Sequence, residues 1–465
     1  MTLRHSSTIE QLEHLDRTAV WHGFTQMAEY ESLIIERGEG NWLIDIRGRR
    51  MLDGVSSLWC NLHGHNHPRI NAAITEQLQR IAHVTSLGMS GRAAVELADR
   101  LVKMTPTGLN HVFFSSDGSS SVEAALKMAF QFWQQCDSPK PKKTKYVALG
   151  AAYHGDTTGG VSLGDVEHFH SLFGPMLFDV LRGPSPTMYR LPANVERHQA
   201  TQYYTDQLRE LLDRDHEQIA AVVVEPLVQG AAGIVVQPDG FLSRVRQMTR
   251  ERDILLICDE VATGFGRTGR MFACEHEDVS PDLMCLGKGL TAGYLPMAAT
   301  LATETVWNAF LGSVGDAKQF FHGHTFSGNP LAAAAGLASL DIFEDDDVLA
   351  SLPAKIDQLR ECLEPLKEHP HVGDIRQKGL MVGIELVSDK TSKSPFPYSE
   401  ARGAGVCRHA LDHDVWIRPL GNVIVLMPPL SIRSDEISLL VDSVRYGLCH
   451  EFPSVEFKLP ATSAV

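Results

Sequence analysis

The sequence predicts an α/β fold with a mainly parallel central sheet in a large domain and a second, smaller α+β domain. Two observations lead to this prediction. Short continuous apolar runs, typical of strands covered on both faces, alternate with segments of helical periodicity between residues 69 and 330. Beyond residue 330 the order changes to helix, strand, helix, strand and helix, which indicates a separate lobe.

The N-terminal segment comes first, and residues 33–46 with the following glycine turn indicate two short strands. The expected strands of the large domain are the apolar runs 111–115, 145–149, 219–225, 254–260, 283–286 and 297–303. The expected helices between them are 120–135, 205–213 and 241–252. We therefore expect an N-terminal segment 1–68 that contributes to the small lobe, a large domain 69–335 and a C-terminal domain 336–465.

The C-terminal domain begins with an alanine-rich helix after Asn329-Pro330. Residues 379–386 and 423–427 are its expected strands, each followed by a helical segment. The tail after Pro453 has no regular pattern, so its role stays open.

Composition and charge argue against several classes of function. The net charge is −15 over 465 residues, which argues against nucleic acid or an anionic membrane as a partner. No run approaches the ~20 apolar residues of a membrane-spanning helix, and the N-terminus lacks the apolar core of a signal peptide. The eight cysteines include no CxxC pair, so a reducing cytoplasm is the expected compartment.

A lysine and an aspartate mark the expected catalytic centre. Asp259 lies at the end of the run 254–260, and Lys288 follows the run 283–286. The C-terminal ends of strands in open α/β sheets face the ligand crevice, so both side chains are expected in one site. A lysine that forms a Schiff base and an acid that keeps a pyridine nitrogen protonated are what pyridoxal phosphate chemistry needs. Either residue taken alone is also compatible with an ordinary strand end.

A phosphate-binding segment is expected between strand 111–115 and the helix that follows. Gly118 lets the backbone approach a ligand closely, and free N–H groups at a helix start suit a phosphate. Ser120 and Glu123 have the spacing of a capping box, so an ordinary capped helix explains the same residues. Tyr153 follows the next strand, where a tyrosine either contacts a bound ring or packs locally.

Two other patterns suggest functions that their context does not support. Residues 264–269 spell G-x-G-x-x-G, but these glycines do not lead from a strand into an apolar helix. We expect a loop that presents Arg267 rather than a dinucleotide site. The histidine-rich segments 63–67 and 322–324 have neither the spacing of a helical pair nor that of a zinc ribbon, so no metal is expected.

Taken together, these residues resemble the class III aminotransferases, which are pyridoxal phosphate enzymes of fold type I. The run from Asp259 to Lys288 is close to that family's signature. The motifs FFSSDGSSSVEAALKMA, AAYHGDT, VVVEPLVQGAAG and FHGHTFSGNPLA extend the resemblance over residues 20–450. It implies pyridoxal 5'-phosphate as cofactor, a homodimer with shared active sites and a small domain formed by both termini. The cofactor contacts that it implies are Gly118, Ser119, Tyr153, Asp259, Lys288, His324 and Thr325, the last two reaching across from the second subunit.

Finer motifs resemble the class III members that make 7,8-diaminononanoate in biotin biosynthesis. The segments WHGFTQM, DGVSSLW, HGHNHP and VWIRP carry this resemblance. It implies transamination of 8-amino-7-oxononanoate, with S-adenosylmethionine as the usual amino donor. The substrate contacts that it implies are Phe24, Leu58, Trp59, Tyr153, Arg267, Gly323 and Arg418. Taken by itself, Arg418 is either a surface charge or a fork for a substrate carboxylate.

Two positions depart from the members that use S-adenosylmethionine, and His324 is a further small change. Phe24 lies where tyrosine is common, Leu58 where the first of two tryptophans is common, and His324 where proline is common. Relatives that take the amino group from lysine share the FTQM pattern, so lysine is an alternative donor. The motifs are also compatible with a different ω-amino acid or polyamine aminotransferase, and the fold with a catalytically silent binding protein.

Overall fold

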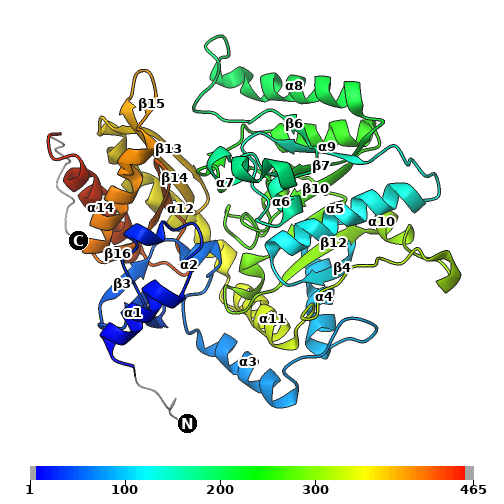
Figure 1. Ribbon diagram of the computed structural model, residues 1–465, viewed down its shortest axis with the longest axis horizontal. Coiled ribbons are helices and arrows are strands. Elements are labelled where there is room, and N and C mark those ends of the chain that lie inside the picture. Colours follow the sequence, from blue (N-terminus) through cyan, green and yellow to red (C-terminus); the bar gives the residue numbers. More distant parts are fainter. Residues whose placement is uncertain (1–6, 456–465) are drawn as a thin grey trace.

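A seven-stranded sheet forms the centre of the large domain and confirms the predicted α/β class. The computed structural model describes residues 7–455, and the strand order of this sheet is β4-β12-β11-β10-β7-β5-β6 (Figure 1). The bounds are β4 Leu109–Ser115, β5 Lys145–Leu149, β6 Leu181–Gly183, β7 Ile219–Val224, β10 Leu255–Asp259, β11 Leu283–Leu286 and β12 Ala298–Thr303. All neighbours pair in parallel except β12, which is antiparallel to both β11 and β4.

The reversal at β12 follows from its short connection to β11. Residues 287–297 link the two strands through the single 3₁₀ turn Lys288–Thr291. A parallel return needs a crossover of about a dozen residues or more, usually with a helix, so this link favours an antiparallel pair. The central sheet is therefore mainly, but not wholly, parallel.

Helices cover both faces of the sheet, and the alternation of side chains along β10 shows how. Leu255 and Ile257 belong to the apolar cluster beneath α5 (Gly118–Gln135), whereas Leu256 and Cys258 face the cluster that includes α8 (Ala200–Asp215) and α9 (Phe241–Glu251). Successive side chains of a strand point to opposite faces, so a continuous apolar run is what a doubly covered strand needs.

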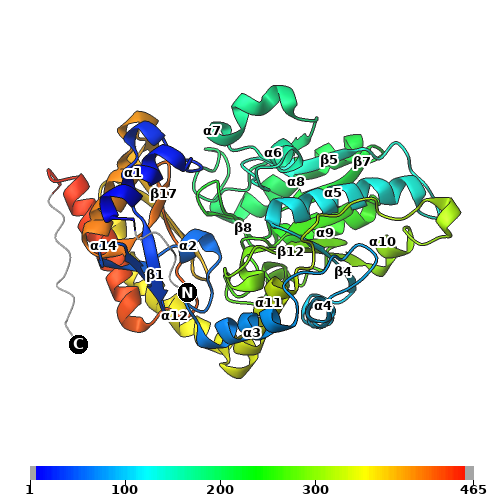
Figure 2. The same ribbon diagram turned by 60° about the horizontal axis from the view of Figure 1, so that its bottom comes forward.

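Both termini build the smaller lobe, as expected. Strands β1 (Ile35–Glu39), β2 (Trp42–Asp45) and β3 (Arg50–Asp53) form an antiparallel ribbon, and β16 (Val415–Trp416) joins β3 in parallel. The α1 and α14 labels lie in the same lobe in both views (Figures 1 and 2). A second sheet of this lobe contains β13 Val372–Lys378, β14 Met381–Asp389, β15 Ser394–Pro395, β17 Arg418–Leu420 and β18 Val423–Leu426.

The remaining elements connect and cover these sheets. The other helices are α1 Ile9–Ala19, α2 Ser56–Trp59, α3 Pro68–Arg80, α4 Arg92–Met104, α6 Thr158–Leu163, α7 Glu167–His170, α10 Glu304–Asn308, α11 Pro330–Asp345, α12 Val348–Leu363, α13 Arg402–Asp412 and α14 Ser434–Glu451. A two-stranded hairpin consists of β8 Val228–Gln229 and β9 Val235–Val236. Among the described residues, no helix has the length and apolar character needed to cross a membrane.

Several boundaries differ from those expected. The Asp117 side chain accepts from the Ser120 N–H, so the capping box begins three residues earlier than the Ser120–Glu123 box that we expected. Helix α8 spans Ala200–Asp215, whereas we expected 205–213, because the polar residues at both ends continue the helix. The domain boundaries after residues 68 and 335 stay a prediction, and so does the character of the tail, since residues beyond 455 lie outside the described part.

Candidate active site

A cavity of about 350 Å³ opens at the C-terminal ends of the parallel strands. Its lining comes from the ends of β5, β7 and β10, from the start of α5 and from α2 in the small lobe. The lining residues are Leu58, Trp59, Asp117, Gly118, Ser119, Tyr153, His154, Gly155, Glu225, Ala231, Asp259, Val261, Ala262 and Lys288. Seven of the residues singled out in the sequence are thus brought together around one space.

Lys288 projects its amine into this cavity. Its Nζ lies 5.6 Å from the centroid of the Trp59 ring, and no hydrogen-bond partner for it occurs among the described residues. The backbone of Lys288 has a φ of 40°, in the left-handed region that non-glycine residues rarely adopt. Loss of hydration lowers the pKa of the amine, although Asp259 and Glu225 partly oppose the shift. A lysine held in this way is closer to its neutral, nucleophilic form than a surface lysine.

Asp259 lies at the end of β10 and is held by two partners. Its Oδ2 is 2.7 Å from Nδ1 of His154, and its Oδ1 accepts from the Val261 N–H at 3.0 Å. The His154 side chain is fully buried, and its Nε2 has no partner in the described chain. Because a carboxylate accepts, the ring nitrogen facing Asp259 carries the proton, which fixes the orientation of the acid in the cavity.

The start of α5 forms a cradle lined by backbone. A Cβ atom at Gly118 would lie 2.5 Å from Cγ1 of Val261, so only glycine lets the chain pass there. Gly155, with a φ of 103°, lies so close to Ser119 that an added Cβ would be 1.7 Å from the Ser119 Oγ. The first N–H groups of a helix have no acceptor within the helix, so this cradle suits a phosphate.

Glu225 was not assigned a role from the sequence, although it follows β7 as Asp259 ends β10. Its Oε1 accepts from the Tyr153 N–H at 3.0 Å, and its Oε2 accepts from the Gly230 N–H at 2.8 Å. Burial raises the pKa of this carboxyl to about 7. The position after an apolar strand was the available signal, whereas the packing that buries the carboxyl could not be read from the sequence.

Aromatic and apolar side chains form the outer wall. Trp59 is 9% exposed and lines the cavity, whereas Leu58 is 53% exposed at its edge. Phe24 does not line this cavity, but its ring contacts Phe169 edge-on at 5.0 Å, and Phe169 lies 6.4 Å from the Tyr153 ring. Burial raises the pKa of the Tyr153 hydroxyl.

Arg267 lies away from the cavity lining. It is 1% exposed, and its guanidinium donates to the carbonyls of Pro428 and Asn61 at 2.6 and 2.8 Å. These contacts connect the loop 264–269 to the N-terminal segment at Asn61 and to the C-terminal segment at Pro428. Burial lowers the pKa of Arg267 to about 10. The observed contacts are those of a structural cross-link, and a substrate contact by Arg267 has no support in this geometry.

Arg418 and the segment 323–325 also lie outside the lining residues of the cavity. Arg418 begins β17 and is half-buried, and within residues 7–455 no carboxylate pairs with it. His324 lies 3.4 Å from the Ser116 Oγ through Nδ1, whereas Gly323 and Thr325 are exposed. Arg418, Gly323 and Thr325 are therefore available to contact a ligand or a second subunit, whereas His324 already has Ser116 as a partner.

The histidine-rich segment 63–67 has structural partners. His63 shares a hydrogen bond with Ser339 at 2.9 Å, and burial lowers its pKa to about 3. His65 lies 2.8 Å from the Asp53 carboxylate. In the part of the chain that the structure describes, no group of three or more His, Cys, Asp or Glu is placed to hold a metal ion.

The fold and this site define a fold type I pyridoxal phosphate enzyme, and the sequence family agrees. The profile of the family described as "Aminotransferase class-III" matches residues 25–446. The chain therefore belongs to the class III aminotransferases, and it is an aminotransferase that uses pyridoxal 5'-phosphate.

Individual relatives narrow the comparison. An adenosylmethionine-8-amino-7-oxononanoate aminotransferase of Geobacter sulfurreducens is 49% identical over 443 residues, covering 94% of this chain and 97% of that protein. An omega-aminotransferase of Caulobacter vibrioides is 35% identical over 437 residues, covering 92% and 97% of the two chains.

Solved structures agree with these sequence relatives. The crystal structure of adenosylmethionine-8-amino-7-oxononanoate aminotransferase from Methanocaldococcus jannaschii has a TM-score of 0.89 at 43% identity, covering 95% of this chain and 99% of that one. A PLP-bound amine transaminase from an uncultivated Pseudomonas species has a TM-score of 0.89 at 38% identity, covering 93% and 98%.

The residues present fit the cofactor. The cradle that a Cβ at Gly118 would fill suits the phosphate, the buried Asp259 suits a protonated ring nitrogen, and Lys288 offers an amine without a partner. The cavity also has the size of a small-molecule site.

Proposed function

We propose that this aminotransferase converts 8-amino-7-oxononanoate to 7,8-diaminononanoate in biotin biosynthesis, with S-adenosylmethionine as amino donor. One observation carries the proposal. Six relatives that are 44–49% identical over 93–95% of this chain bear the name adenosylmethionine-8-amino-7-oxononanoate aminotransferase. These alignments span nearly the whole chain, and therefore take in the substrate-facing segments as well as the cofactor cradle.

Each active-site residue has a role in this proposal. Bound pyridoxal phosphate supplies an aldehyde that holds the donor amine and a ring that draws electrons from it. Lys288 attaches the cofactor between turnovers and carries the transferred proton, a role that suits an amine of lowered pKa. Asp259 holds a proton at the ring nitrogen, and His154 orients Asp259. Gly118 and Ser119 hold the phosphate.

Arg418 is proposed to bind the carboxylate of 8-amino-7-oxononanoate. The absence of a carboxylate partner within the described residues leaves its planar guanidinium available for bidentate binding. Ile417, the preceding residue, packs at Gly54, which leads into α2 and the cavity wall. An arginine at this place would fix one end of a long substrate while its ketone lies at Lys288.

Lysine is the second candidate donor, and two side chains favour it. Phe24 and Leu58 are 64% and 53% exposed. Phe24 has no hydroxyl and Leu58 has no aromatic ring with which to contact the nucleoside of S-adenosylmethionine. A smaller amino acid donor needs neither. Either donor would use the same site, because the donor and the oxo acid bind there in turn.

A homodimer is the proposed assembly. Large apolar side chains remain exposed along 307–326 and near 87–89, including Phe321 at 70%, Phe326 at 62% and Leu87 at 62%. Exposed apolar patches of this kind favour protein–protein contact. In the proposed dimer a second copy covers them, and His324 and Thr325 reach the phosphate of its cofactor. A reducing compartment, the cytoplasm, stays part of the proposal because the eight cysteines include no CxxC pair.

A half-reaction tests the proposal. Purified holoenzyme is mixed separately with S-adenosylmethionine and with lysine, and the visible absorbance of the cofactor is followed. Loss of absorbance with S-adenosylmethionine alone, restored by 8-amino-7-oxononanoate, is the expected result. The same behaviour with lysine alone would make lysine the donor. No change with either amine would overturn the substrate assignment and leave the Caulobacter omega-aminotransferase as the better guide.

A further inference from the structure

A strained turn forms one wall of the active-site cavity. The hairpin of β8 and β9 turns at residues 230–234, and the N–H groups of Gly233 and Ile234 both donate to the Gly230 carbonyl, at 3.1 and 2.9 Å. Gly233 has a φ of 99° and Ile234 a φ of 56°. Such a conformation is costly for a β-branched residue and persists only where its surroundings determine it.

The front of this turn faces the reacting groups. Ala231 lines the cavity, and the Gly230 N–H donates to the Glu225 carboxylate at 2.8 Å. The Gly230 Cα lies against the Trp59 indole so closely that an added Cβ would be 3.1 Å from a ring carbon. Figure 2 places α2, which carries Trp59, beside β8 where the two lobes meet. A shift of the turn would therefore displace Trp59 and Glu225, which lie beside the Lys288 amine.

The back of the hairpin is packed unevenly: Ile234 is fully buried against the C-terminal sheet, whereas Val235 and Val236 border open space. A second cavity of about 410 Å³ lies behind it, lined by Val235, Val236 and Gln237 of the hairpin and by residues of α12 and β13. Along this open stretch, polar contacts add to the packing of Ile234.

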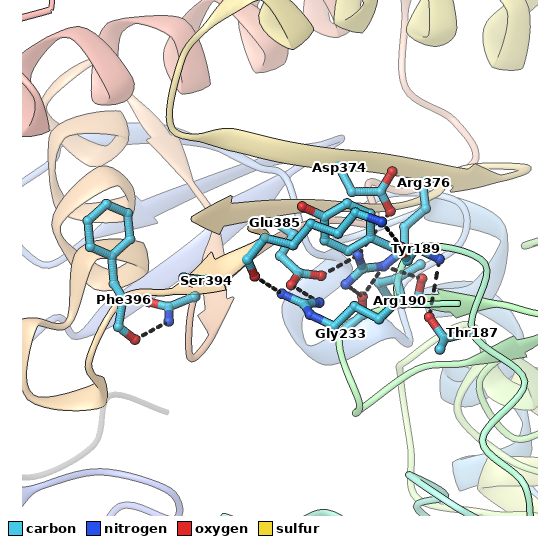
Figure 3. A network of polar contacts seen from close by, with 12 residues as sticks. Thr187, Tyr189, Arg190, Gly233, Asp374, Arg376, Glu385, Ser394 and Phe396 are labelled. Atoms are coloured by element: carbon cyan, nitrogen blue, oxygen red, sulfur yellow. Dashed lines mark hydrogen bonds and ion pairs between the residues drawn. The ribbon is translucent and has the colours of Figure 1, made fainter. Parts of the chain in front are cut away.

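Arg376 of β13 supplies these contacts, as Figure 3 shows. Its Nε donates to the carbonyls of Gly233 and Ile234 at 2.9 and 3.0 Å, and its Nη2 donates to Gly233 at 2.7 Å. Its Nη1 donates to Glu385 at 2.5 Å and to Asp374 at 3.2 Å. The guanidinium thus binds the carbonyls of Gly233 and Ile234. The carboxylates of Glu385 and Asp374 hold the guanidinium in place.

A second layer of contacts holds the same network in place. Glu385 also pairs with Arg190 of the large domain. The Lys393 ammonium donates to the Tyr189 carbonyl at 2.7 Å and lies 4.9 Å from the Tyr189 ring centroid. The network therefore joins the large domain to the C-terminal sheet directly behind the active-site wall.

We propose that Arg376 is a positioning residue for catalysis, acting through the turn 230–234 on Glu225, Trp59 and the space around Lys288. The inference depends on the active site described above and not on the identity of the substrate. A lysine at this place keeps the charge that Glu385 needs but cannot fork to two carbonyls, so the two functions of the side chain are separable.

The test compares Arg376→Met, Arg376→Lys and the control Arg246→Met. Arg246 is matched because its side chain is 10% exposed and pairs with Asp282, against 11% for Arg376. Amide hydrogen exchange of residues 227–237 is measured without substrate. Both Arg376 variants are expected to exchange about tenfold faster or more in this segment, whereas Arg246→Met leaves it unchanged.

The second measurement is the half-reaction rate with whichever amine the wild-type protein accepts. Both Arg376 variants are expected to lose up to about 100-fold in this rate while still binding cofactor, and Arg376→Lys is expected to keep near wild-type thermal stability. Unchanged exchange at 227–237, or faster exchange with an unchanged half-reaction, would overturn the inference. Should Arg376→Met fail to fold, Arg376→Lys alone decides between these outcomes. If the proposed biotin-pathway substrate is wrong, the wild-type protein will react with a different amine. The comparison between the Arg376 variants and the wild type is unaffected.

Discussion

The carboxylate of Asp259 and the imidazole of His154 lie 2.7 Å apart in a pocket that buries both side chains. This pair fixes where the negative charge of the site lies relative to a bound pyridine ring. The contact makes His154 a partner that orients the acid.

Replacing His154 with phenylalanine should weaken the hold on Asp259. A hydrogen bond to a charged group contributes about 1.5–3 kcal/mol, so we expect kcat to fall about ten- to 100-fold. Steady-state kinetics at saturating cofactor measures the loss. His154→Asn, whose amide N–H can still reach toward Asp259, serves as the control and should recover part of it; equal losses in both variants would argue for a packing role only.

Removing the Lys288 amine should abolish turnover. We expect no measurable product from Lys288→Ala, because no other amine lines the cavity among the described residues. Borohydride reduction followed by mass spectrometry should attach cofactor covalently to the wild-type chain and not to the variant. Residual activity well above background in the variant would rule out the assigned role.

Arg418→Met should separate the two substrates kinetically. Loss of a bidentate contact to a carboxylate costs about 2–3 kcal/mol, so the KM for 8-amino-7-oxononanoate should rise about 30- to 100-fold. The KM for the donor should change much less. Equal increases for both substrates would contradict the proposed contact, and Arg418→Lys tests whether charge without the fork is enough.

Glu225 should make stability fall as the pH rises. Burial raises its folded-state pKa to about 7 from an ordinary value of 4.5. The folded state then holds a proton that the unfolded state has released, so this contribution is present below about pH 4.5 and is lost through about pH 7. The full effect is ~3 kcal/mol.

Urea unfolding of the apo-protein at about pH 5 and about pH 8 tests this dependence. Glu225→Gln should show a smaller difference in unfolding free energy between the two pH values than the wild type. Glu368→Gln, at an exposed glutamate, is the matched control and should behave like the wild type. A Glu225→Gln profile parallel to the wild type would mean that this carboxyl does not titrate in that range.

Mixing two inactive variants should test the shared active site. Lys288→Ala lacks the amine, and Thr325→Asp places a negative charge where the phosphate of a neighbouring subunit is proposed to lie. If Thr325 acts across the dimer, subunit exchange creates one intact site per mixed dimer, and activity returns. If Thr325 serves its own chain, the mixture stays as inactive as either parent.

The centre of the site could be predicted from the sequence because the geometry of the sheet determines which residues meet there. Asp259, Lys288, Gly118 and Tyr153 each follow an apolar run, and the carboxyl ends of parallel strands meet along one edge. Their convergence needs only the strand order. The antiparallel β12 does not disturb it, because that strand enters the sheet beside β11 without moving the ends of the others.

Other features depend on long-range packing that no local pattern encodes. His154 and Asp259 are 105 positions apart, and Arg376 reaches Gly233 across 143. Arg267 follows a glycine in a polar loop, which suggested an accessible side chain, yet the small lobe closes over it. The strained φ of Ile234 is likewise set by its partners and not by its own preference.

The pairing of β3 with β16 has a consequence for how the protein is made. On the side away from β2, residues 52 and 53 pair with residues 415 and 416, far along the chain. During synthesis the first ribbon therefore leaves the ribosome long before β16 exists, and the sheet of the small lobe stays incomplete until then. The lobe that carries Leu58 and Trp59 of the cavity wall is therefore completed only after the chain has emerged as far as β16.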